Sequence, residues 1–252
     1  MNPAFSLSGR RIVVTGANTG IGQGIAVSIA RAGGVVVGVG RSAMDETARL
    51  VEAEGAVFTP VRCDLADAAA ARAMFEAAWD DHGPFDGLVN NAGIIRRADA
   101  LDFTEADWDD VMDVNLKTLF QLSQAFARRL VAADRPGKIV NVASLLSFQG
   151  GIRVASYTAS KHGVLGITRL LANEWAAKRI NVNGVAPGYI ETNNTEALRA
   201  DADRSSAILG RIPAGRWGRP EDIGDTAVFL LAPASDYMHG AVIPVDGGWL
   251  AR

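Results

Sequence analysis

The chain has 252 residues, a formal net charge of −3 and a pI near 5.7. This length suits one α/β domain with a large core. The acidic balance argues against nucleic acid or an anionic membrane as the main partner. Apolar runs such as 35–39 and 227–232 are far shorter than a membrane span, and no signal peptide is expected at the N-terminus.

The cysteine and histidine content argues against disulfides and metals. Cys63 is the only cysteine, so no internal disulfide can form, which suits a reducing compartment. His82, His162 and His239 are scattered and lack the spacing of metal ligands. We therefore expect a cytoplasmic protein that binds no metal.

Predicted strands and helices alternate from end to end. Continuous β-rich apolar runs predict strands at about 11–15, 35–39, 57–62, 86–90, 137–142, 180–186 and 241–245. Helices are predicted between them, near 21–32, 43–53, 67–81, 104–132, 156–178 and 220–231. The alternation predicts an α/β Rossmann fold, a single domain over 1–252. Its doubly wound parallel sheet would have about seven strands, with helices on both faces.

The turn after the first predicted strand has the glycine spacing of a phosphate-binding loop. It reads Thr15-Gly-Ala-Asn-Thr-Gly-Ile-Gly22 and leads into a helix. Glycines allow the backbone to approach a diphosphate, whose charge a helix N-terminus stabilises. We expect residues 1–150 to bind mainly a dinucleotide, with its diphosphate along Gly16, Asn18, Thr19, Gly20, Ile21 and Gly22. An ordinary strand–turn–helix junction is the alternative.

The end of the second predicted strand bears on the choice of dinucleotide. An acidic residue there usually binds the ribose 2′-hydroxyl of NAD. This segment reads Val37-Gly-Val-Gly-Arg-Ser42 and has no acid. The guanidinium of Arg41 could pair with a 2′-phosphate. We predict NAD(P) as the cofactor with a lean to NADP, the alternative being that Arg41 is a solvated loop residue.

Ser144, Tyr157 and Lys161 follow the pattern S-x12-Y-x3-K. Residues four apart share a helix face, so Tyr157 and Lys161 should point into the same space. A lysine about 5 Å away, at an effective dielectric near 20, would lower the tyrosine pKa by about two units. Tyr157 is then a general acid–base for interconverting a secondary alcohol and a ketone. Ser144 would hydrogen-bond the same substrate oxygen.

Several of these residues follow predicted strands. Gly16, Asp64, Asn91, Ser144 and Pro187 lie just past strand ends. Because the carboxyl ends of parallel strands meet at one edge, where ligands bind, we expect these residues to converge on one site.

The order of the motifs is typical of one family. The chain resembles the short-chain dehydrogenase/reductase family over essentially its whole length. The resemblance is carried by Thr15-Gly-x-x-x-Gly-x-Gly22, Asp64, Asn90-Asn-Ala-Gly93, Asn115, Ser144, Tyr157-x-x-x-Lys161 and Pro187-Gly188.

The resemblance implies further cofactor contacts. They are Asp64 and Leu65 at the adenine, Asn91, Ala92 and Gly93 at its ribose, and Pro187, Gly188, Ile190 and Thr192 near the nicotinamide. Asp64 could equally cap a helix or shape a turn. Tyr157 and Lys161 also count as cofactor contacts, with Lys161 on the nicotinamide ribose. Asn115 completes the catalytic set and is implied to hold a water that links Lys161 to solvent.

Four segments resemble a narrower group, the 2-deoxy-D-gluconate 3-dehydrogenases, also called 2-dehydro-3-deoxy-D-gluconate 5-dehydrogenases. They are 93–97, 144–153, 189–217 and 246–252. The group implies a small sugar acid as substrate and a lid over 189–213. A carboxylate with hydroxyls needs arginine, amides and hydroxyls. The candidates are Arg97, Ser144, Gln149, Arg153, Asn193 and Asn194, with Arg153 preferred for the carboxylate.

Alternatives stay open at this point. One is another activity of the family, such as 3-oxoacyl-carrier-protein reduction, and another is a regulator that binds dinucleotide without turnover. The arginines and the Asn-rich lid suit a small polar substrate better, and all four catalytic residues are present. The resemblance also implies a homotetramer formed through 104–132 and 156–178, with Trp249 and Arg252 as candidates for reaching a neighbouring site.

Overall fold

A computed structural model describes residues 2–252, and within that range seven strands form one all-parallel sheet in the order β3-β2-β1-β4-β5-β6-β7. The strands are β1 (Arg11–Thr15), β2 (Val35–Gly40), β3 (Phe58–Arg62), β4 (Gly87–Asn90), β5 (Gly137–Val142), β6 (Ile180–Pro187) and β7 (Val242–Val245). Each lies within one residue of its predicted range. The predicted doubly wound sheet is therefore confirmed, with its order reversing between β1 and β4, where such sheets bind ligands.

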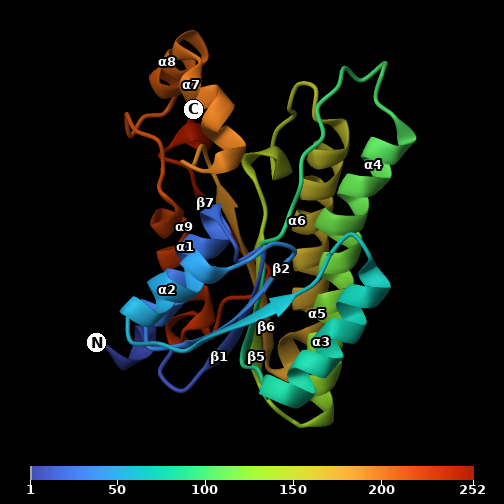
Figure 1. Cartoon of the computed structure of the whole chain (residues 1–252), viewed down its shortest axis with the longest axis vertical. Coiled ribbons are helices and arrows are strands. Elements are labelled where there is room, and N and C mark those ends of the chain that lie inside the picture. Colours follow the sequence, from blue (N-terminus) through green and yellow to red (C-terminus); the bar gives the residue numbers. More distant parts are fainter. Residues whose placement is uncertain (1) are drawn as a thin grey trace.

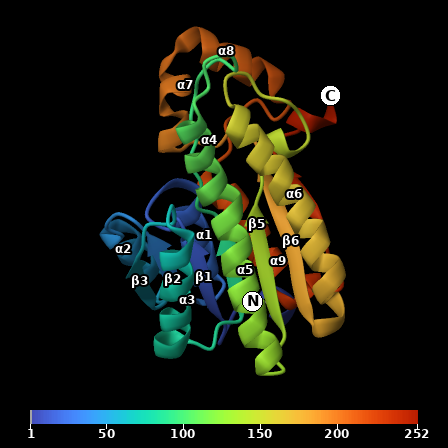
Figure 2. The same ribbon diagram turned by 90° about the vertical axis from the view of Figure 1, so that its right-hand side faces the viewer.

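Helices cover both faces of the sheet (Figures 1 and 2). One layer consists of α1 (Gly20–Arg31), α2 (Asp45–Ala53) and α9 (Pro220–Leu231). The opposite layer consists of α3 (Ala68–His82), α5 (Leu119–Ala132) and α6 (Ala155–Trp175), with α4 (Glu105–Met112) packed on α6. No helix within 2–252 is both long and apolar enough to cross a membrane.

The central strands are mainly apolar because helices cover both faces of the sheet. Ile12 and Val14 of β1 pack in the core beneath α1 and α9, whereas Val13 packs in the core beneath α3 and α5. Successive side chains of a strand point to opposite faces, so apolar residues are needed on both, and buried polar side chains such as Asn141 and Asn183 make hydrogen bonds. All residues of β5 and β6 are buried for the same reason.

The helix predicted over 104–132 is not uniform. After α4 the chain makes a π-helical segment, η2 (Asp113–Thr118), before continuing as α5. Such a turn accommodates an extra residue and is common at functional sites. Asn115, which is intrinsically unfavourable in a helix interior, lies in this segment.

Residues 189–213, for which the sequence pattern predicts no regular element, contain two short helices. These are α7 (Glu196–Ala200) and α8 (Ala202–Arg211), and neither has a buried residue. Asp201 caps α8 by accepting a hydrogen bond from the Arg204 backbone N–H at 3.1 Å. Both helices lie at the same end of the molecule as the C-terminal residues (Figure 1).

Candidate active site

A cavity of about 990 Å³ lies at the carboxyl ends of the strands. Its wall includes the turn after β1, the segments that follow β2 to β6, the α7–α8 region and Trp249. The predicted cofactor, catalytic and substrate residues all line it, with the exceptions of Asn115 and Arg153. Motifs far apart in the sequence thus meet around one space, as the strand-end argument predicts.

The glycine turn has the local structure of an anion-binding loop. Gly16 and Gly20 have φ angles of +67° and +57°, which favour glycine. A Cβ atom on Gly22 would lie 2.1 Å from the carbonyl oxygen of Gly16, so no side chain fits there. Thr19, the N-cap of α1, makes no side-chain capping bond. The first N–H groups of the helix are left for a ligand such as a diphosphate, and the residues present fit a dinucleotide.

Asn91 fastens the end of β4 to the end of β1. Its side-chain amide donates to the Thr15 carbonyl at 2.9 Å, and the backbone N–H groups of Asn91 and Ala92 donate to the Thr15 hydroxyl at 3.0 and 3.1 Å. Thr15 is buried. The Asn91 amide is therefore committed to the backbone, while the residue still lines the cavity.

Tyr157 and Lys161 lie one helical turn apart on α6, with the Lys161 Nζ 5.5 Å from the centre of the Tyr157 ring. Burial raises the pKa of Tyr157, while a hydrogen bond with Ser144 and the charge of Arg97 lower it. The net direction is upward. The expectation that Lys161 brings the Tyr157 pKa toward neutrality is therefore wrong for this structure, because burial outweighs the favourable contacts.

Lys161 is itself buried at the end of β5. Its Nζ donates to the Val142 carbonyl at 2.7 Å, and burial lowers the pKa of the ammonium to about 8. The Lys161 carbonyl accepts a hydrogen bond from the Ser147 hydroxyl at 2.7 Å. Ser147 also accepts from the Ser144 backbone N–H at 3.3 Å. These contacts hold α6 against the segment that carries Ser144.

Asn115 lies behind the cavity wall. Its Oδ1 accepts from the Ile94 N–H at 2.8 Å, and its Nδ2 donates to the Ile94 carbonyl at 2.9 Å and to the Ser160 hydroxyl at 3.3 Å. The side chain therefore joins the segment after β4 to α6. The water relay implied for Asn115 stays a prediction.

The candidate substrate residues divide into two sets. Arg97, Gln149, Asn193 and Asn194 line the cavity, and the Asn193 amide donates to the Thr19 hydroxyl at 3.4 Å. Arg153 does not line it. Its backbone is left-handed, with a φ of +64°, and its Nε lies 3.1 Å from Asp99 Oδ1. The preferred carboxylate ligand thus has its charge paired outside the cavity.

The lining residues that are absent from the predicted site include Tyr189, Arg204, Arg211 and Trp249, the last considered only as a contact to a neighbour. Arg204 and Arg211 are seven residues apart, so a helix places them on one face. Recognising 202–211 as helical would have grouped them.

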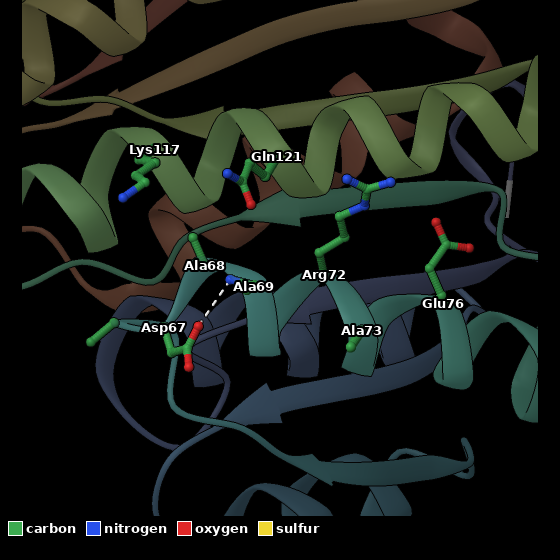
Figure 3. A pocket seen from close by; sticks show the side chains of 9 residues that line it. Asp67, Ala68, Ala69, Arg72, Ala73, Glu76, Lys117 and Gln121 are labelled. Atoms are coloured by element: carbon green, nitrogen blue, oxygen red, sulfur yellow. Dashed lines mark hydrogen bonds between the residues drawn. The ribbon is translucent and has the colours of Figure 1, made fainter.

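Arg41 and Asp64 face each other at the dinucleotide end, with 4.0 Å between Nη1 and Oδ2. Asp64 also accepts from the Ala66 N–H at 3.1 Å, the turn-shaping role left open for it. The cap of α3 is Asp67. Asp67 borders a separate hollow of about 770 Å³ between α3 and residues 117–121 (Figure 3), which contains none of the predicted catalytic residues.

A parallel α/β sheet whose edge cavity joins a glycine turn to a serine–tyrosine–lysine set defines a dinucleotide-dependent oxidoreductase. Comparisons with known proteins agree. A family model described as enoyl-(acyl carrier protein) reductase matches residues 16–250. The chain belongs to the short-chain dehydrogenase/reductase family. It is an NAD(P)-dependent oxidoreductase acting on CH–OH groups, and the predicted family and enzyme class are confirmed.

Individual relatives match over nearly the full length. The 2-dehydro-3-deoxy-D-gluconate 5-dehydrogenases of Dickeya dadantii and Escherichia coli are each 56% identical, covering 98% and 99% of this chain and 98% of each relative. A solved structure from Agrobacterium tumefaciens is described as a candidate 2-deoxy-D-gluconate 3-dehydrogenase with bound NADP. It is 64% identical, covers 100% of both chains and has a TM-score of 0.95.

Proposed function

We propose that this chain is a 2-dehydro-3-deoxy-D-gluconate 5-dehydrogenase, which interconverts a secondary alcohol and a ketone on a small sugar acid. The observation that carries the proposal is the 56% identity to enzymes of that name over 98% or more of the chain. The cavity supports it, because Arg97, Arg204 and Arg211 line the same space as Ser144 and Tyr157. A cluster of guanidiniums suits a substrate with a carboxylate.

The proposed chemistry centres on the proton at the substrate oxygen. When bound, the dinucleotide supplies or accepts the hydride. Tyr157 would donate its proton to the carbonyl oxygen during reduction and accept one during oxidation. Because burial raises its pKa, the phenol is protonated at neutral pH and ready to donate. Ser144 would hold the same oxygen through its hydroxyl.

Lys161 and Asn115 have supporting roles in this proposal. The Lys161 ammonium, fixed by the Val142 carbonyl at 2.7 Å, would hold the nicotinamide ribose. When charged, it also favours the phenolate form of Tyr157. Asn115 would hold the water that links Lys161 to solvent. Residues 1–150 would bind mainly the dinucleotide, and 189–213 would act as the lid.

We further propose a preference for NADP. Arg41 lines the cavity just beyond β2, its side chain is 79% exposed, and its nearest carboxylate oxygen is 4.0 Å away. The guanidinium is therefore available for a 2′-phosphate. The 64% identical structure and a 49% identical one from Beutenbergia cavernae are both described with bound NADP.

A homotetramer is proposed through the layer formed by α5 and α6 (Figure 2). Val131 and Leu170, on these helices, are 51% and 45% exposed. A neighbouring subunit could cover them. Light scattering during gel filtration should give four times the chain's mass of 26.5 kDa, and a monomeric mass would contradict the proposal.

A substrate panel tests the activity. Purified protein would be assayed with 2-dehydro-3-deoxy-D-gluconate, 2-deoxy-D-gluconate, D-gluconate and a 3-oxoacyl thioester, each with both dinucleotides. We expect the highest kcat/KM on a deoxy sugar acid. A 29% identical 3-oxoacyl-(acyl-carrier-protein) reductase shares this fold with a TM-score of 0.91, so the thioester is the relevant competitor. A higher kcat/KM on the thioester would refute the proposal.

A further inference from the structure

The arginines on the substrate side of the cavity differ in whether they are paired. Arg96 lies 3.4 Å from Asp107 and 2.9 Å from Asp110. Within residues 2–252, Arg97, Arg204 and Arg211 have neither a carboxylate within 4.0 Å nor a side-chain hydrogen bond. Three guanidiniums facing one cavity without a counter-ion favour an anionic ligand.

Arg211, at the end of α8, is held in place by an aromatic ring. Its guanidinium carbon lies 4.0 Å from the centre of the Trp249 ring, a distance typical of cation–π contacts. Trp249 is only 5% exposed and packs on Tyr189, with 4.7 Å between ring centres. Stacking uses the flat face of the guanidinium and leaves its in-plane N–H donors for a carboxylate.

The indole of Trp249 supplies a second, independent sign of a ligand. Its Nε1 is buried and has no hydrogen-bond acceptor among the described residues. A buried donor without an acceptor is unfavourable. Because Trp249 lines the cavity, an oxygen that arrives with a ligand could satisfy this donor.

Arg204 and Tyr189 complete the cluster. Both arginines line the cavity with Tyr189, and their charges lower the pKa of the Tyr189 phenol, which burial raises. Trp249 also packs with Leu145, the neighbour of Ser144. The cluster therefore adjoins the catalytic serine but is built from the lid, the segment after β6 and the C-terminal turn.

Arg97 lies nearer the reacting end, because its charge lowers the pKa of Tyr157. In a six-carbon 2-keto acid that reacts at C5, the carboxyl carbon is four bonds away, about 5 Å. The group that binds the carboxylate must therefore lie away from Tyr157, on the far side of the substrate from the reacting carbon.

We infer that Arg211, stacked on Trp249 and assisted by Arg204, binds the carboxylate of the substrate. The lid and the C-terminal residues then form the acid end of the site. This inference rests on the proposed function and replaces Arg153 as the carboxylate ligand.

The test compares a sugar acid with its neutral carboxamide in wild type, Arg211→Met, Arg211→Lys and Trp249→Phe. Losing a charge-assisted bond should raise the KM of Arg211→Met for the acid about tenfold or more, with little change for the carboxamide. Arg211→Lys should raise the KM for the acid less than Arg211→Met does, and Trp249→Phe should raise it about fivefold. Arg72→Met is the matched control, because Arg72 is on α3, exposed, and does not line the cavity.

An unchanged KM for the acid in Arg211→Met, or an equal rise for acid and carboxamide, would overturn the inference. If the wild-type protein turned over no sugar acid, the proposed function would be refuted instead. In that case calorimetry with D-gluconate decides the inference: binding to wild type that Arg211→Met abolishes supports it, and no binding to wild type rejects it.

Discussion

The two ends of the cavity are built differently. At the dinucleotide end, the turn after β1 leads into a helix with eight buried residues, and Thr15 is locked to the end of β4 by hydrogen bonds. At the acid end, α7 and α8 have no buried residue and present unpaired arginines. Changes at the first end should therefore alter stability together with binding. Changes at the second should alter substrate choice with little loss of stability.

The proposed catalytic residues between the two ends give the largest expected effect. Tyr157→Phe removes the only proton that the mechanism moves and should lower kcat by about 10³-fold. Fluorescence titration should show unchanged NADPH affinity, because the ring and both ends of the cavity remain. A kcat within tenfold of wild type would remove Tyr157 from its role.

Lys161 should make stability depend on pH. Its pKa is about 8 in the folded chain, against an ordinary 10.5, so the unfolded chain binds more protons between these values. The Lys161 contribution to the free energy of unfolding should therefore increase as pH rises through this window, by as much as about 3 kcal/mol. Urea unfolding of wild type and Lys161→Met from about pH 7 to about pH 10 measures it. A constant difference between the two proteins would contradict the buried ammonium.

A pair of glycine substitutions contrasts the two ends directly. A Cβ on Gly22 would meet Gly16 O at 2.1 Å and Asn91 Nδ2 at 2.5 Å. Gly22→Ala should therefore lower the free energy of unfolding by about 1–3 kcal/mol and weaken dinucleotide binding. A Cβ on Gly210, in α8, would meet no neighbouring side chain or segment within 4 Å. Gly210→Ala should stabilise by up to about 1 kcal/mol. Equal destabilisation by both would erase the contrast.

Arg41 offers the smallest effect. Arg41→Ala should lower the ratio of kcat/KM for NADP to that for NAD about tenfold, because one charge-assisted contact is lost. KM for the sugar acid should not change, since the acid end is untouched. An unaltered ratio would mean that residues other than Arg41 determine the cofactor preference.

The sequence predicts best the strands, whose composition is set by burial on both faces of the sheet. Every strand is recovered to within one residue, because a parallel strand covered on both faces, such as β6, is mainly apolar. The glycine turn and the Ser144–Tyr157–Lys161 spacing predict the cavity wall, because strand ends share an edge. Features that depend on tertiary packing could not be predicted from the sequence. The upward pKa of Tyr157 comes from burial that spacing cannot reveal.

Residues 189–213 and Arg153 show the same limit. Helices α7 and α8 have no fully buried residue and are only 5 and 10 residues long, so neither gives the long apolar repeat by which a helix is recognised. Arg153 takes a left-handed backbone, with its side chain on Asp99. Residue type alone does not separate Arg153 from Arg211, yet of the two the fold places only Arg211 on the cavity.

The π-helical segment sets the winding of everything that follows it. If 113–118 took regular α-helical winding with all of its residues kept, the rest of the helix would turn by about 100°. Leu122, Phe126 and Leu130, which pack in the core beneath α5, would then rotate away from the sheet. Deleting one residue would instead remove the extra residue of the π turn and leave these three side chains facing the core.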